Sequence, residues 1–510
     1  STAKFITSSK DVKRSNSNIL TVPEINLEVG QEYIEYLLDL EIVSNNLIYL
    51  AAAYNGGPGN LKKWKHAETK AKIITWDVTS YYGYLPATFI HQDLSLDFID
   101  TDSVDYAAKH QFWPERLNSK LERDPKGEIK VIKTTMGMSF MYAPFFFMAH
   151  GFAHLSKYEP NGFSQPYEFF LIVSCLFYLF IGLFYLRKLL LFSFSEWSTS
   201  LTMVTILAGT NLYYYASAEP AMSHAFSFSL IICFIFQSVL WLSENNLKRA
   251  VYIGLLGGLI ILIRPVNIFI FLVPLFYNIA SVKQFSDRIN YFIRKWKHTI
   301  VITLLSFFVL LPQLIYWKAI TGCWLFNSYV DERFYFNNQH VLEGLFSYRK
   351  GWLVYTPIMI FAFIGLVFLF KKHRKYFLSI SVFLFVNIIV LYSWWSWWYG
   401  GGFGSRPMID SYGLLAIPIA CFYSAILKNK RISIPILSIG ILLITLNQIQ
   451  TFQHRRGIIH WEAMTKKAYW NVFLKMDMDV DDWARQESYL QSPDQNKARA
   501  GIDEYDFNPF

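Results

Sequence analysis

The stretch AMSHAFSFSLIICFIFQSVLWL (221–242) contains no aspartate, glutamate, lysine or arginine. About 20 consecutive apolar residues are enough for a helix to cross the hydrocarbon core of a bilayer. A run of this length therefore predicts a membrane-spanning helix rather than a core helix of a soluble domain. Similar apolar runs occupy 168–187, 198–216, 249–264, 265–280, 299–318, 353–370, 376–395, 409–427 and 432–450. The sequence thus predicts an all-α polytopic membrane protein with about ten transmembrane helices.

The overall composition agrees with this prediction. Of the 510 residues, 53% are hydrophobic and only 17% are charged, whereas soluble domains average about 25% charged residues. The chain is polar and mixed up to about Lys133, so its apolar content is concentrated further along. We expect four regions, namely a small helical fragment (1–66), an external loop with juxtamembrane helices (67–167), a transmembrane core (168–450) and an external surface tail (451–510).

The net charge of +9 comes from short basic clusters between the apolar runs. These clusters are Arg187 with Lys188, Lys248 with Arg249, 294–297, 371–375 and 428–431. Lysine and arginine collect in cytoplasmic loops of membrane proteins, so this pattern indicates a lipid bilayer as partner and argues against nucleic acid. Placing every cluster in the cytoplasm turns 216–221, 264–265, 319–352, 394–408 and the chain after about 451 outward.

The segment TTMGMSFMYAPFFFMAHGFAHL (134–155) leaves two arrangements open. Pro144, His150 and His154 interrupt its apolar character. An interfacial or re-entrant helix, which we favour, would place the Asp77 region outside together with the other outward loops. A spanning helix would instead place everything before it in the cytoplasm.

The predicted outward side holds nearly all the candidate functional side chains. They are Asp77, followed by Tyr81 and Tyr82, in TWDVTSYYGYLPA, Glu219 and His224 in SAEPAMSH, Arg264 in LIRP, Arg349 and Lys350 in SYRKGW, and Arg406 in GSRPMIDSYG. Ionisable groups at helix ends in a membrane are functional candidates. Three structural readings stay open: Asp77 as a helix N-cap, Glu219 as an ordinary loop carboxylate and Arg264 as a snorkelling side chain.

These residue types suit one chemistry. A carboxylate can deprotonate a hydroxyl or hold a divalent cation such as Mg²⁺ or Mn²⁺, with Asp77 as the ligand. Arginines bind phosphate through two parallel hydrogen bonds, and aromatic side chains stack on sugar rings. A lipid-phosphate sugar donor requires all three at one interface.

From about Ile73 to Lys475 the chain resembles the integral-membrane GT-C-type glycosyltransferases, in particular the protein O-mannosyltransferase and aminoarabinose transferase types, in a Bacteroidetes-like version. The motifs that carry the resemblance are WDVTSYY, MYAPFFF, AEPAMSH, SYRKGWLVYTP, GSRPMIDSYG and IIHWEAMTKKAYW. The resemblance implies a polyprenyl-phosphate sugar donor, a glycan, lipid or protein acceptor, and a multi-pass location in the bacterial cytoplasmic membrane.

The same resemblance implies roles for individual residues. Asp77 would be the catalytic base or metal ligand, Glu219 a second active-site acid, and Arg264 and Arg406 the donor-phosphate ligands. We also assign substrate binding to His224, Tyr81, Tyr82, Arg349 and Lys350. In the family a transmembrane helix precedes the Asp-bearing loop, whereas polar sequence precedes Asp77 here. We therefore expect closure of the donor groove, and with it activity, to be impaired.

The segment TVPEINLEVGQEYIEYLLDLEIVSNNLIYLAAAYNGGPGNLKKW (21–64) resembles the C-terminal half of the lysozyme-like domain of soluble lytic transglycosylases. The resemblance places Tyr54 and Asn55 near sugar subsites. The catalytic glutamate of that family lies upstream of the matching part, and Glu24 and Glu32 lack its sequence context. We therefore expect a remnant without cleavage activity, with weak glycan binding as its residual function.

Two other functions stay open. One is a membrane-attached protein related to peptidoglycan lytic transglycosylases, and the other is a polytopic transporter. A transporter would show internal repeats and midplane charges, which the sequence lacks. The cysteines predict neither a metal site nor a disulfide framework; they are Cys175, Cys233, Cys323 and Cys421.

Overall fold

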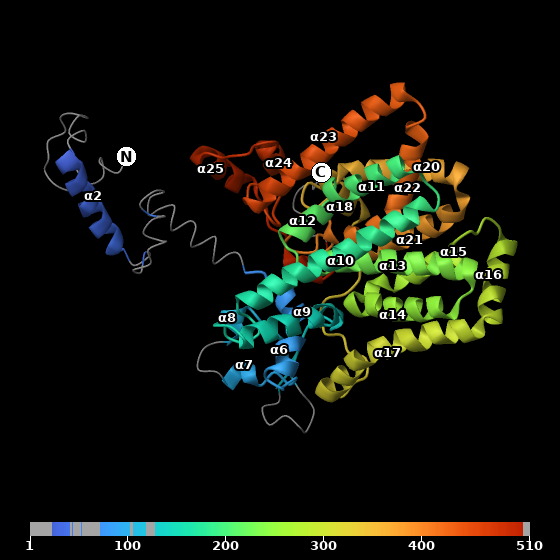
Figure 1. Ribbon diagram of the computed structural model, residues 1–510, viewed down its shortest axis with the longest axis horizontal. Coiled ribbons are helices and arrows are strands. Elements are labelled where there is room, and N and C mark those ends of the chain that lie inside the picture. The colour runs from blue at the N-terminus through green and yellow to red at the C-terminus, as the bar shows by residue number, and fades with distance from the viewer. Residues whose placement is uncertain are drawn as a thin grey trace. The chain divides into compact units, whose positions relative to one another are not determined.

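The protein is described by a computed structural model in which the chain divides into two units, Ser1–Lys72 and Ile73–Phe510 (Figure 1). The described residues are 23–40, 43, 53, 72–101, 106–118 and 128–502. In the first unit, helix α2 (Pro23–Leu38) forms where the sequence predicts one, and its Tyr33 and Leu37 are buried. The predicted glycan-binding residues Tyr54 and Asn55 lie outside the described residues.

The second unit begins with short elements that precede the bundle. They are α5 (Asp77–Tyr82), α6 (Tyr84–Phe89), α7 (Phe98–Thr101), α8 (Tyr106–His110), β1 (Glu115–Asn118) and β2 (Glu128–Val131). The two strands form an antiparallel ribbon in which Glu115 is opposite Val131. The side chains of Tyr84, Val131 and Tyr316 belong to one buried cluster. This part of the chain is therefore packed onto the bundle through its own small core.

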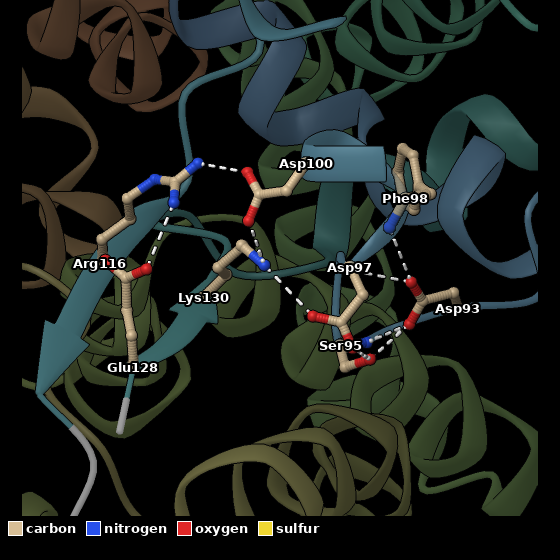
Figure 2. Close-up of polar contacts among 8 residues, drawn as sticks. All are labelled: Asp93, Ser95, Asp97, Phe98, Asp100, Arg116, Glu128 and Lys130. Carbon is tan, nitrogen blue, oxygen red and sulfur yellow. Dashed lines mark hydrogen bonds and ion pairs between the residues drawn. The ribbon is translucent and has the colours of Figure 1, made fainter. Parts of the chain in front are cut away.

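A polar network ties the ribbon to the segment that follows α6 (Figure 2). The Asp100 carboxylate accepts hydrogen bonds from Arg116 (2.7 Å) and pairs with Lys130 (2.8 Å). These two bonds hold the pKa of Asp100 at about 2, below its usual range. Lys130 also reaches Asp97 at 3.1 Å, and the Asp93 carboxylate accepts from backbone N–H groups of the turn that follows it. The network fixes the turn before α7 against β2.

Helix α9 (Gly137–His154) corresponds to the ambiguous segment 134–155. It is not among the helices of the described chain that are long and apolar enough to cross a membrane. A Cβ at Gly137 would lie 2.4 Å from the backbone nitrogen of Ile263, so the start of α9 approaches the end of α14 (Leu247–Ile263) closely. Tyr142 donates a hydrogen bond to the carbonyl of Ala221. The first turns of α9 thus lie beside the loops that carry Glu219 and Arg264.

The rest of the second unit is a helical bundle with a helical C-terminal segment. Its elements are α10 (Gln165–Leu191), α11 (Glu196–Ala208), α12 (Leu212–Ser217), α13 (Ser223–Glu244), α14 (Leu247–Ile263), η2 (Pro265–Phe271), α15 (Leu272–Phe276), α16 (Val282–Arg294), α17 (Trp296–Thr321), α18 (Val341–Phe346), α19 (Trp352–Tyr355), η3 (Pro357–Met359), α20 (Ile360–Lys372), α21 (Arg374–Tyr392), η4 (Arg406–Ser411), α22 (Tyr412–Ile426), α23 (Lys430–Arg455), α24 (Lys466–Val472), α25 (Val480–Tyr489) and α26 (Gln495–Arg499). Helices α13 and α22 are buried along nearly their whole length, whereas few side chains of α17 and α23 are buried. In Figure 1, α17 and α23 flank the bundle with α13 between them.

Six helices in the described part of the chain could cross a membrane by length and composition. They occupy residues 165–191, 223–244, 296–321, 374–392, 406–426 and 430–455. The predicted count of about ten is not confirmed. The run 198–216 is interrupted at Gly209, and 353–370 begins with a short helix that ends before Pro357, which lacks a backbone N–H. The run 265–280 forms a 3-10 helix and one short α-helix, and α14 spans only 17 residues.

Turns with basic clusters meet at one end of the bundle. Ser193, just after α10, contacts the hydroxyl of Tyr376 at 3.3 Å. The backbone N–H of Asn278 donates to the carbonyl of Lys375 (2.7 Å), and Trp241 donates to the ring of His298 (3.0 Å). These contacts join the neighbourhoods of four of the five predicted clusters. We call this the basic end, and its opposite carries the candidate site.

Candidate functional site

Asp77 opens α5 directly after Trp76, whose positive φ of 51° turns the chain into the helix. The N-cap position of α5 is occupied by Trp76 and Asp77 is the first residue of the helix, so the N-cap reading of Asp77 does not describe the structure. Its Oδ2 instead lies 2.9 Å from Nη2 of Arg406. The Asp77 side chain is 46% exposed and that of Arg406 only 16%. The carboxylate is therefore oriented by a largely buried cation and still reaches solvent.

The loop before Arg406 is shaped by glycines. Gly400, Gly402 and Gly404 have φ values of +64°, +138° and +60°, a region that other residues adopt only at a cost. A Cβ on Gly402 would lie 2.4 Å from the hydroxyl of Tyr215. The same hydroxyl accepts a hydrogen bond from the backbone N–H of Phe403 (2.9 Å). The glycines thus allow the loop to pack closely against α12 and to place Arg406 opposite Asp77.

Glu219 and Lys350 lie in the same electrostatic cluster. Burial raises the pKa of Glu219, and the Tyr214 hydroxyl donates a 2.8 Å hydrogen bond to its carboxylate. Arg406, Lys350 and Asp77 all influence this pKa through their charges. Lys350 is buried, and it donates to the carbonyls of Gly402 and Trp461, the latter at 2.5 Å. The cluster therefore combines two carboxylates with the buried Lys350 and the largely buried Arg406.

A second buried cluster adjoins the first through the segment that contains Arg406. Nη1 of Arg264 lies 3.3 Å from Oδ2 of Asp410 and 3.2 Å from Nδ1 of His224. The side-chain amide of Asn267 donates to the same Asp410 oxygen at 2.8 Å. Sequence reasoning did not single out Asp410 or Asn267. Asp410 follows Arg406 by one turn in GSRPMIDSYG. This spacing was the available signal that Asp410 lies near the candidate site.

The remaining predicted residues separate into those near the cluster and those elsewhere. Burial raises the pKa of the Tyr81 phenol, and the charges of Asp77, Arg264 and Arg406 act on the same group. Tyr82 points into the core instead, where its hydroxyl donates to the carbonyl of Gly162 at 2.5 Å.

The side chain of Arg349 likewise makes structural contacts. Its Nη2 donates to the carbonyl of Gln491 (3.2 Å), and its guanidinium lies 5.7 Å from the ring centroid of Trp398. The structure therefore brings Tyr81 and Lys350 to the cluster and turns Tyr82 and Arg349 towards structural contacts.

The C-terminal segment, which was predicted as an external surface tail, folds onto this end as α24 to α26. Trp398 donates to the Glu462 carboxylate at 2.8 Å, and Gln491 donates through its backbone to the carbonyl of Ala463 (2.9 Å). The carbonyl of Trp461 receives the Lys350 hydrogen bond described above. The segment is thus part of the wall of the site.

A divalent cation does not fit the residues present. In the described part of the chain, no group of three or more histidine, cysteine, aspartate or glutamate side chains could hold a metal ion. Asp77, the predicted metal ligand, is paired with the guanidinium of Arg406. Hard divalent cations require several oxygen ligands, so we derive no step through a metal.

A family model of the transglycosylase SLT domain matches residues 2–76. This segment is similar to lytic transglycosylases. The match is longer than the predicted 21–64, and it ends directly before Asp77, so the helical bundle lies outside it. No curated protein and no solved structure matches the chain. The comparison thus indicates a transglycosylase-related N-terminal segment, from a family of the cell envelope, joined to a helical part with six apolar helices long enough to span a membrane.

Stability should depend on pH through Lys350. Burial lowers the pKa of this amine to about 7, against about 10.4 in an unfolded chain. Between these values the unfolded state binds more protons, so the free energy of unfolding rises with pH, by at most about 1.4 kcal/mol per pH unit, and this gain is lost as the pH falls to about 7. Thermal unfolding in detergent from about pH 6 to about pH 10 measures the slope.

Lys350→Met should remove that slope, whereas Lys467→Met, at an exposed lysine of α24, should keep it. An unchanged slope in the Lys350 variant would show that another group causes it.

Proposed function

We propose that residues 73–475 form a membrane glycosyltransferase that moves a sugar from a polyprenyl-phosphate donor to an acceptor hydroxyl at the outer face of the bacterial cytoplasmic membrane. The acceptor is a glycan, a lipid or a protein. The observation that carries the proposal is the 2.9 Å pair between Asp77 and Arg406, which joins a half-exposed carboxylate to a largely buried cation. Arg264 and Lys350 add further positive charge near that pair.

The proposed reaction is a single displacement. The acceptor hydroxyl gives its proton to the Asp77 carboxylate while its oxygen attacks the anomeric carbon of the donor sugar. The bond between that carbon and the phosphate oxygen breaks, and polyprenyl phosphate leaves with the electron pair. Arg406, Arg264 and Lys350 stabilise the negative charge that develops on the phosphate. Attack opposite the leaving group inverts the configuration of the sugar.

The arrangement of the helices supports a lipid-linked donor. The candidate cluster lies opposite the basic end, and the turns of the basic end belong in the cytoplasm. A buried cluster of charges at the other end of apolar helices would meet a phosphate at the membrane surface while the isoprenoid chain stays among lipids.

A second candidate function has support from the SLT match over residues 2–76. A segment related to lytic transglycosylases would bind or cleave peptidoglycan. Zymography of the full chain on cell-wall sacculi tests cleavage: a lysis band would make this the primary activity, and its absence leaves the membrane part as the catalytic unit.

Membrane sidedness tests the main proposal before any activity assay. Cys323 is the exposed cysteine, whereas Cys175, Cys233 and Cys421 are buried. In a Cys323→Ser background, we expect Trp76→Cys, at a residue that is 79% exposed, to react with a membrane-impermeant maleimide on intact spheroplasts.

Lys248→Cys, at the basic end, is the matched control and should react only after lysis. Labelling of both positions from the same side would contradict the proposed orientation. With the orientation established, release of polyprenyl phosphate from a reconstituted donor is the assay of transfer.

A further inference from the structure

Helix α16 is an amphipathic helix in which no residue is buried. Apolar side chains recur along it at the three- and four-residue intervals that form one helical face. They are Val282, Phe285, Ile289, Phe292, Ile293 and, just beyond the helix, Trp296. Val282 is 87% exposed and Ile293 64%. A large apolar face is therefore open to the surroundings.

One edge of α16 is held against the bundle. The ring of Phe292 stacks on that of Trp241 with centroids 5.7 Å apart, and Phe285 stacks on Phe276 at 5.5 Å. Arg288 donates to the carbonyl of Tyr277 at 2.7 Å. The helix thus has a fixed position, while Val282, Ile289, Ile293 and Trp296 remain exposed.

The segment 282–297 is strongly basic. It contains five basic side chains and one acidic side chain, so its net charge is +4. The basic residues are Lys283, Arg288, Arg294, Lys295 and Lys297, and the acidic residue is Asp287. The cluster 371–375 lies nearby, because Asn278 is hydrogen-bonded to the carbonyl of Lys375. Positive charge is therefore combined with exposed apolar surface.

Helix α16 directly precedes a helix that is long and apolar enough to cross a membrane. Lys295 separates it from α17, one of the six helices that could cross a membrane. Figure 1 shows α16 running across the end of the longer helices rather than alongside them. When α17 spans a bilayer, a helix in this place lies at the boundary between headgroups and acyl chains.

We propose that α16 binds anionic phospholipids of the adjacent leaflet, with its apolar face among the acyl chains and its lysines and arginines on the phosphates. Basic amphipathic helices bind membranes through buried apolar area together with attraction to anionic headgroups. A soluble protein partner would not need the exposed face to continue directly into a membrane span. The occupant is therefore a lipid that carries net negative charge.

The test uses the full chain in detergent and measures binding of fluorescent phosphatidylglycerol and phosphatidylcholine. We expect binding of the anionic lipid to be about 10-fold tighter, and we expect Arg294→Gln with Lys297→Gln to remove most of that preference. Lys466→Gln with Lys467→Gln, two exposed lysines of α24, is the matched control and should keep it.

Equal loss in the control, or equal weakening of both lipids in the α16 variant, would overturn the proposal. A spin label at Ile293→Cys, in the Cys323→Ser background, gives a second readout in nanodiscs that contain phosphatidylglycerol. Greater access of oxygen than of a water-soluble nickel complex is expected, and the reverse would place α16 in water. Neither measurement depends on sugar transfer, so the outcome is separate from the proposed function.

Discussion

Replacing Asp77 with asparagine is expected to lower the turnover of sugar transfer by about 10²- to 10⁴-fold, the range that a positioned general base contributes. The amide cannot accept the acceptor proton, although it keeps the size and one oxygen of the carboxylate. Donor binding should change little, so kcat falls while KM for the donor stays nearly constant. The measurement is the initial rate of polyprenyl phosphate release by the full chain in vesicles.

The variant should remain folded. Asp77 is half-exposed, and ion pairs of exposed carboxylates contribute only about 0–1 kcal/mol to stability. Asp331→Asn, at an exposed carboxylate of the segment before α18, is the matched control and should leave the rate unchanged. Full turnover by the Asp77 variant would remove this residue from the mechanism and return Glu219 to consideration as the base.

The helical bundle could be predicted from the sequence because apolar runs and basic clusters are local signals. The number of spans could not, because hydropathy averaged over a run hides where the helix breaks. Gly209 ends α11, and Pro357 separates α19 from α20, within runs that look continuous by composition. The C-terminal segment is a similar case. The sequence predicted an external surface tail there but not its helices, in which Asp479 caps α25 and Asp482 pairs with Lys475 at 2.6 Å.

The sequence predicted which residue types form the candidate site, but not which of the neighbouring side chains point into it. Tyr81 and Tyr82 are neighbours with the same chemistry, and successive helix positions point about 100° apart. Only Tyr81 lies close enough to Asp77 for that charge to act on its phenol, while the Tyr82 hydroxyl is bonded to Gly162. Residue-level roles of this kind depend on tertiary contacts, which a single sequence does not encode locally.

Asp410 was missed for a related reason. It stands at the entry to an apolar helix, and Arg406, the basic residue one turn before it, pairs with Asp77 instead. Its partners, Arg264 and Asn267, lie across the bundle and are joined to it only by the fold. Pairing over such a sequence distance leaves no periodic signal, so the counter-charge of Arg264 emerges only from the structure.

Asp410→Ala is accordingly expected to lower the free energy of unfolding by about 3 kcal/mol, the lower end of the range for breaking a buried ion pair. The Asp410 side chain is only 2% exposed, and its loss leaves the Arg264 guanidinium and the Asn267 amide without their shared acceptor. Asp410→Asn keeps an acceptor oxygen, so it should cost less. Both losses of unfolding free energy are measured by unfolding the purified chain in mixed micelles with increasing amounts of a denaturing detergent.

A double variant separates the ion pair from simple loss of volume. Arg264→Gln removes the charge that Asp410→Ala would leave without a partner, so the two changes together should cost less than the sum of their separate effects. Additive costs would mean that Asp410 stabilises the bundle by packing and not as a counter-charge. In that case Arg264 would not depend on Asp410 for its position. The contact with His224 and the turn that begins η2 would then hold Arg264 beside the pair of Asp77 and Arg406.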